Sequence, residues 1–105
     1  MASTWSRETV GDDRVRMLVR GEIDLADERP LIEEVDAVVG TSTDVVVELD
    51  LAEVDFIDSS GLRALLLLRR AHGDRVLLGA RSAPVQRVLE IAGLAEMFTD
   101  HAANG

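Results

Sequence analysis

Two consecutive hydroxyl side chains, Ser59 and Ser60, lie between Asp58 and Gly61 in the stretch DFIDSSGLRALLLLRR, residues 55–70. A leucine-rich run that predicts a helix follows them directly. A serine at the start of a helix can accept hydrogen bonds from the first N–H groups, and the helix dipole favours negative charge beside it. The residues alone therefore leave two interpretations of the serines, a helix cap or a group presented for chemistry.

Ser59, His72 and an aspartate suggest comparison with a catalytic triad. However, DSSG is not a nucleophile elbow of the G-x-S-x-G type. His72 ends the predicted helix roughly 20 Å from Ser59, at about 1.5 Å per residue. The other histidine, His101, falls in a predicted tail, and the sequence has no phosphate-binding loop, dinucleotide motif or histidine pair at metal-ligand spacing. We therefore expect no enzymatic activity, no catalytic residue, no metal site and no cofactor.

The composition limits the class of protein. The chain has 105 residues, 47% of them hydrophobic, and a formal net charge of −9. This length favours a single domain, and the charge argues against nucleic acid, whose phosphates would repel the surface. There is no cysteine, no apolar segment of a signal peptide and no apolar run that could span a membrane. We expect a cytoplasmic protein with no membrane contact.

The first half of the chain predicts a hairpin and a helix. Two extended segments, 4–10 and 14–23, are separated by the turn signal GDD, and the alternation in the second leaves one face mostly solvated. Residues 25–40 have the apolar spacing of an amphipathic helix. We expect Asp27 to cap this helix, Pro30 to fall in its first turn and Gly40 to end it.

The second half alternates strands and helices. The segment 44–51 predicts a strand buried on both faces, and it is followed by the helix after Asp58. A strand over 74–80 and a helix in the segment 83–93, with Gly93 after its end, come next, and 96–100 is a candidate last strand. Such alternation predicts an α/β fold with a mostly parallel, mixed central sheet and helices packed on it. Ser59 then lies just past the carboxyl end of a central strand, where α/β proteins usually place their sites.

The stretch DFIDSSGL, with GEID at residues 21–24 and SAPVQRVLEIAGL at 82–94, resembles the STAS domain of bacterial anti-sigma factor antagonists. The resemblance covers about residues 5–100 of one domain, 1–105, with 101–105 as a tail. It implies that an anti-sigma factor that is also a serine kinase phosphorylates the first serine of the pair, here Ser59. A phosphatase would reverse the modification, and the unphosphorylated form would bind the anti-sigma factor and free a sigma factor.

The resemblance also implies which residues flank the phosphorylation site or contact the partner. Asp24 and Asp58 match acidic positions of the family, and Ser60 and Gly61 adjoin the acceptor. Asp24 can equally be a turn residue at a strand end. Leu67 points away from the core face of its predicted helix at 100° per residue, so we expect a partner contact there, although a single exposed leucine is common and needs no explanation.

The chain departs from the family at its end, because MFTDHAANG is too short and polar to form the usual last helix. We therefore expect one sheet face to be less covered, and a second copy of the chain or a partner to cover it. One alternative function also stays open, namely a non-signalling STAS subunit of, for example, a membrane transporter complex. A phosphoacceptor serine favours the first function, since a structural subunit has no need of one.

Overall fold

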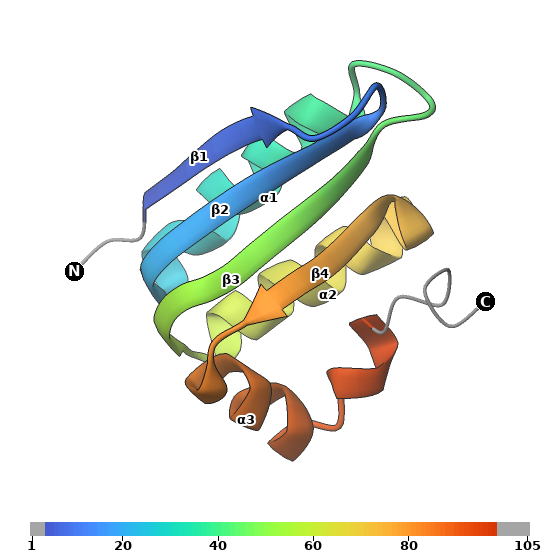
Figure 1. Ribbon diagram of the computed structural model, residues 1–105. Helices are drawn as coiled ribbons and strands as arrows, with labels where there is room; N and C mark the ends of the chain where they lie inside the picture. Colours follow the sequence, from blue (N-terminus) through green and yellow to red (C-terminus); the bar gives the residue numbers. More distant parts are fainter. Residues whose placement is uncertain (1–3, 99–105) are drawn as a thin grey trace.

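The computed structural model describes residues 4–98 of the chain. Four strands alternate with three α-helices and two short 3-10 helices (Figure 1). In chain order the elements are β1 (Thr4–Thr9), β2 (Arg14–Ile23), α1 (Leu25–Val39), β3 (Val46–Ile57), α2 (Ser59–His72), η1 (Gly73–Arg75), β4 (Val76–Arg81), α3 (Ala83–Ile91) and η2 (Ala95–Phe98).

The strands form one mixed sheet in the order β1-β2-β3-β4 (Figure 1). β1 and β2 are the antiparallel hairpin predicted from the GDD turn, whereas β2, β3 and β4 run parallel to one another. Each parallel strand is followed by a helix, as βαβ connections require. The predicted α/β class and mixed sheet are therefore confirmed.

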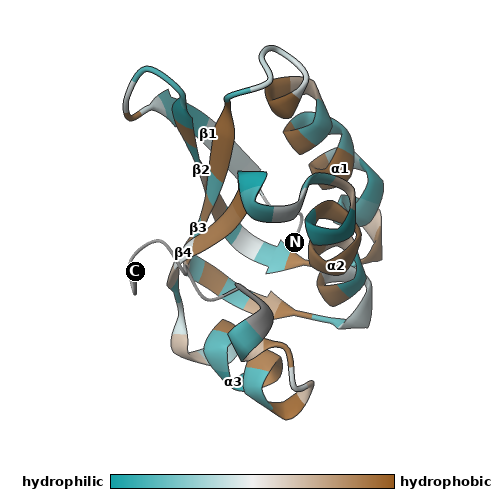
Figure 2. Cartoon of the chain, turned by 90° about the vertical axis from the view of Figure 1, so that its right-hand side faces the viewer, coloured by the Kyte–Doolittle hydropathy of each residue, from teal (hydrophilic) through white to brown (hydrophobic). Residues whose placement is uncertain are grey.

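One face of the sheet holds the hydrophobic core. Figure 2 shows α1 and α2 together on one side of the sheet, with their apolar residues toward it. Strand residues at every second position, such as Val47, Leu49 and Leu51, are fully buried beneath them. α3 packs instead beside the carboxyl-terminal half of β3, where Ser82 Oγ donates to the Val54 carbonyl oxygen at 2.6 Å.

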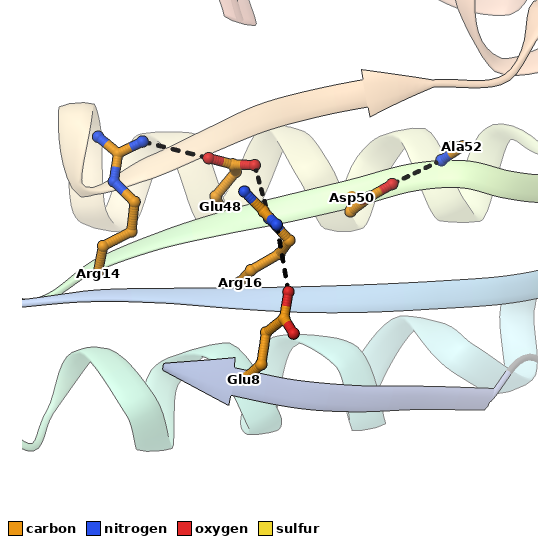
Figure 3. A network of polar contacts seen from close by, with 6 residues as sticks. All are labelled: Glu8, Arg14, Arg16, Glu48, Asp50 and Ala52. Carbon is orange, nitrogen blue, oxygen red and sulfur yellow. Dashed lines mark hydrogen bonds and ion pairs between the residues drawn. The ribbon is translucent and has the colours of Figure 1, made fainter. Parts of the chain in front are cut away.

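The other sheet face is polar, which corrects the prediction that segment 44–51 is buried on both faces. Glu48 lies on this face and accepts hydrogen bonds from Arg14 at 3.2 Å and Arg16 at 3.1 Å, and Arg16 also pairs with Glu8 (Figure 3). The hydrogen bond to Glu48, and then its charge, raise the pKa of Arg16 above the ordinary value. Within residues 4–98 no helix covers this network, because all three helices pack elsewhere.

Two expectations for α1 are wrong in detail. The helix begins at Leu25 rather than after Asp27, so its N-cap is Asp24 and Asp27 is the third residue of the helix. Pro30 then falls inside the helix, in its second turn, where its missing N–H removes a backbone hydrogen bond. The helix begins earlier because the Asp24 carboxylate accepts from the first turn and Asp27 accepts from the Asp24 backbone nitrogen. Gly40 ends it as expected.

The end of the chain forms no strand over Ala95–Phe98, where the structure has the 3-10 helix η2 in place of the candidate strand. The rest of that candidate, and the predicted tail, lie outside the described residues. α3 ends at Ile91, and Gly93 follows it with a positive φ of 74°, as its position after the helix predicted. Coverage of the polar sheet face by a second copy or a partner stays a prediction.

Candidate functional site

All three α-helices begin at the same edge of the sheet, the carboxyl ends of the parallel strands. Each follows its strand after a single N-cap residue, namely Asp24 for α1, Asp58 for α2 and Ser82 for α3. Each cap residue has extended backbone, and its side chain accepts a hydrogen bond from the first turn of its helix. The predicted site of Ser59 therefore lies at an edge where three helix amino termini meet.

The cap of α2 is Asp58 and not a serine. Asp58 Oδ1 accepts from the Gly61 backbone nitrogen at 3.0 Å. Ser59 is the first residue of the helix and is exposed, and Ser60 is half-buried. Within residues 4–98 neither hydroxyl makes a hydrogen bond, so the cap interpretation of the serines is wrong. A carboxylate accepts more strongly than a hydroxyl beside the positive helix end, which explains why Asp58 takes this role.

Asp24 directly follows the end of β2 and is the N-cap of α1. Its Oδ1 accepts from the Ala26 nitrogen at 3.0 Å, and Asp27 Oδ2 accepts from the Asp24 nitrogen at 3.0 Å, which completes a capping box. The Asp58 backbone nitrogen donates to the Ile23 carbonyl oxygen at 3.2 Å. This bond joins the ends of β2 and β3, so the two predicted acidic residues follow paired positions of adjacent strands.

Gly61 permits the close packing of α2 at this edge. A β-carbon built at this residue would lie 2.6 Å from Ile57 Cγ1, 2.9 Å from Ile23 Cγ2 and 3.0 Å from the Ile23 carbonyl oxygen. Ile23 and Ile57 are buried and their strands pair at these positions. The glycine next to the serine pair is thus required by the contact between α2 and the two strand ends.

The exposed face of α2 begins at Ser59. Arg63 and Leu67 follow at intervals of four residues, so they extend the same face of the helix. Leu67 is 41% exposed, as the helical spacing predicted, whereas Leu65 and Leu68 are fully buried. The structure therefore places the predicted acceptor and the predicted contact Leu67 on one accessible surface.

A salt bridge joins the first turn of α1 to the second turn of α2. Arg63 donates from Nε to Glu28 Oε2 at 3.0 Å and from Nη2 to both carboxylate oxygens at 2.8 and 3.0 Å. Glu28 is largely covered, with 19% of its side chain exposed, against 60% for Arg63. The pair holds a guanidinium one helical turn from Ser59.

Two exposed apolar residues at this edge were missed by the sequence analysis. Leu25 is the first residue of α1, in the position that Ser59 has in α2, and is 67% exposed. Phe56 is 49% exposed although β3 is a core strand. Val47 and Leu49 are buried, so alternation along the strand places Phe56 on the opposite, exposed face, but the predicted strand ended at residue 51 and did not include it. The exposure of Leu25 could have been predicted from its place directly after Asp24, at the start of a helix.

Residues 4–98 contain no group of three His, Cys, Asp or Glu side chains that could hold a metal ion. No helix in this described part is long and apolar enough to cross a membrane. Two shallow pockets in the described part of the chain lie at the β1–β2 edge, and Ser59 lines neither of them.

Comparison with known proteins shows to which family a chain with this fold belongs. A family model described as "Mlab, STAS domain" matches residues 6–99. An anti-sigma-B factor antagonist of Listeria monocytogenes is 35% identical over 90 residues, which are 82% of this chain and 77% of the relative. The chain therefore belongs to the STAS domain family of anti-sigma factor antagonists.

Solved structures agree with this assignment. The crystal structure of an anti-sigma factor antagonist from Mycobacterium paratuberculosis superimposes with a TM-score of 0.79 at 28% identity, covering 92% of this chain and 83% of that one. The antagonist SpoIIAA in its unphosphorylated form has a TM-score of 0.71 at 21% identity, covering 89% and 84%, and this likeness shows the fold alone. Anti-sigma factor antagonists are regulators, so the prediction that the chain is not an enzyme is confirmed.

Proposed function

We propose that the chain is an anti-sigma factor antagonist switched by phosphorylation of Ser59. The unphosphorylated form binds an anti-sigma factor that is also a serine kinase, and a sigma factor is released in the cytoplasm. Phosphate on Ser59 blocks this binding until a serine phosphatase removes it. The observation that carries the proposal is the position of Ser59, an exposed hydroxyl with no hydrogen bond in the described part of the chain, at the first residue of α2.

Ser59 is free for modification because Asp58 performs the capping. The Gly61 nitrogen is already satisfied by Asp58, so a kinase can take the Ser59 hydroxyl without breaking a contact of the fold. The phosphate adds about −1.5 to −2 charges at pH 7, and the amino end of a helix favours such charge. We therefore expect phosphorylation to leave the backbone of the domain nearly unchanged. Ser60 is half-buried, which makes it the poorer acceptor of the two.

The charge itself is sufficient to switch binding if Ser59 lies inside the partner contact. One partner carboxylate at about 6 Å costs roughly 3 kcal/mol per unit of added charge, at an effective dielectric constant of about 20. This energy corresponds to a loss of affinity on the order of a hundredfold, so no conformational change is needed. The contact surface that we propose contains Ser59 and Leu67 on α2, with Asp24, Asp58 and Gly61 supporting the edge.

Mass measurement after incubation with the anti-sigma kinase of the same organism and ATP tests the acceptor. We expect one added phosphate on the unaltered chain and on Ser60→Ala, and none on Ser59→Ala. Ser59→Ala should still bind the kinase, because its fold contacts are intact. Full labelling of Ser59→Ala would overturn the assignment, and no labelling of any variant would favour the alternative of a non-signalling STAS subunit.

A further inference from the structure

The positive charge nearest to Ser59 along α2 belongs to Arg63. The two residues are separated by four positions and both are exposed on the same face of the helix. Side chains at this separation have Cβ atoms about 5–6 Å apart, and the side chain of arginine is long enough to reach a group attached to the serine oxygen. Arg70 is the next arginine on this exposed face, and it lies about three turns from Ser59.

The hydrogen bonds of Arg63 leave part of its guanidinium unused. Nε and Nη2 donate to Glu28, whereas Nη1 makes no hydrogen bond within residues 4–98. A guanidinium presents five N–H donors in a fixed plane and binds carboxylates and phosphates in the same way. Glu28 therefore holds the guanidinium near the amino end of α2 while donors remain for a second anion.

We propose that Arg63 receives the phosphate on Ser59, with Glu28 holding its guanidinium in reach until the phosphate is present. This inference rests on the proposed modification of Ser59 and adds a specific residue that binds the product. Arg63 partly neutralises the phosphate and fixes its direction on the α2 surface. Glu28 then competes with the phosphate for Arg63, and its own negative charge repels the phosphate. Arg63 therefore stabilises the phosphate dianion, whereas Glu28 destabilises it.

The experiment uses the full chain with phosphoserine incorporated at position 59 during expression, so it does not depend on any kinase. Phosphorus NMR is recorded as a function of pH, and the midpoint of the second phosphate ionisation is measured in four proteins. These are the chain with no further change, Arg63→Gln, Glu28→Gln, and Arg70→Gln as a matched control on the same helix. Arg63 and Arg70 are exposed, and Glu28 is half-buried.

We expect Arg63→Gln to raise the midpoint by roughly half a pH unit, about a threefold change in proton affinity, because a cation that favours the dianion is lost. Glu28→Gln should lower the midpoint, and Arg70→Gln should leave it unchanged. The effect of Arg63→Gln should shrink in 1 M salt, which screens exposed charges. An equal midpoint in the unchanged and Arg63→Gln proteins would overturn the inference, as would shifts of the same sign for Arg63→Gln and Glu28→Gln, which indicate a purely structural salt bridge.

The failure of this inference is distinguishable from failure of the proposed function. If the kinase does not modify Ser59, the proposed function fails, while the titration of the incorporated phosphoserine still decides the role of Arg63. If the kinase modifies Ser59 and the titration shows no dependence on Arg63, only the inference is wrong.

Discussion

The backbone nitrogen of Asp58 donates to the carbonyl oxygen of Ile23 at 3.2 Å, and this bond ties the end of β3 to the end of β2. Asp24 and Asp58, the two N-caps, therefore follow neighbouring strand ends, and α1 and α2 begin side by side. Ser59 comes directly after this tied edge, so a stable scaffold rather than a free loop presents its hydroxyl.

Replacing the cap of α2 should destabilise the domain. Asp58→Ala removes the acceptor of the Gly61 nitrogen, and we expect the free energy of unfolding to fall by about 1 kcal/mol, whereas Asp58→Asn should keep most of it. Urea unfolding measures both. Asp55→Ala is the control, because Asp55 is exposed on the same strand and should change stability little. Equal stability of Asp58→Ala and the unaltered chain would show that Asp58 is not the cap.

Adding one methyl group at Gly61 should also destabilise the domain. Its Cβ would approach Ile57 and Ile23, including the Ile23 carbonyl oxygen, within 3.0 Å. Overpacking of this kind costs about 1–3 kcal/mol, which exceeds the gain of about 1 kcal/mol in helix propensity. Gly11→Ala is the control, since nothing lies within 4 Å of a β-carbon there. Chemical denaturation that finds Gly61→Ala more stable would contradict the packing at this edge.

Truncation of Leu67 should separate binding from stability. We expect Leu67→Ala to change the free energy of unfolding by less than about 0.5 kcal/mol, because the side chain is 41% exposed, and to weaken partner binding by at least about fivefold. Leu68→Ala, at a fully buried neighbour, should instead cost about 2–5 kcal/mol of stability. Both are measured by urea unfolding and by titration with the anti-sigma factor. Unchanged affinity of Leu67→Ala would leave Leu67 as an ordinary exposed leucine.

The sequence predicted the order of the elements well because the relevant signals are local. The GDD turn, the helical spacing of residues 25–40 and the run after Asp58 each correspond to an observed element. The exposure of Leu67 on α2 followed from the helical period alone. The edge position of Ser59 followed from the alternation of strands and helices.

The errors arose where tertiary context decides between local alternatives. Asp24 and Asp27 are both good caps, and the capping box uses Asp24 as the cap and Asp27 as its support. Glu48 is a charged residue in an otherwise apolar strand. Its hydrogen-bond partners Arg14 and Arg16 come from the neighbouring strand β2, so the sequence of β3 alone could not show that this face is exposed and polar. The salt bridge between Arg63 and Glu28 spans 35 positions, so no local pattern could predict it.

The central claim is that phosphate on Ser59 blocks binding through its charge at a preformed surface. The direct measurement is the affinity for the anti-sigma factor of the same organism, by calorimetry, for the unmodified chain and for the chain with phosphoserine at 59. We predict that phosphorylation weakens binding by about a hundredfold, with amide spectra changed only near the start of α2, and that Ser59→Asp weakens it less. Equal affinity of the two forms, or spectral changes across the whole sheet, would contradict the account.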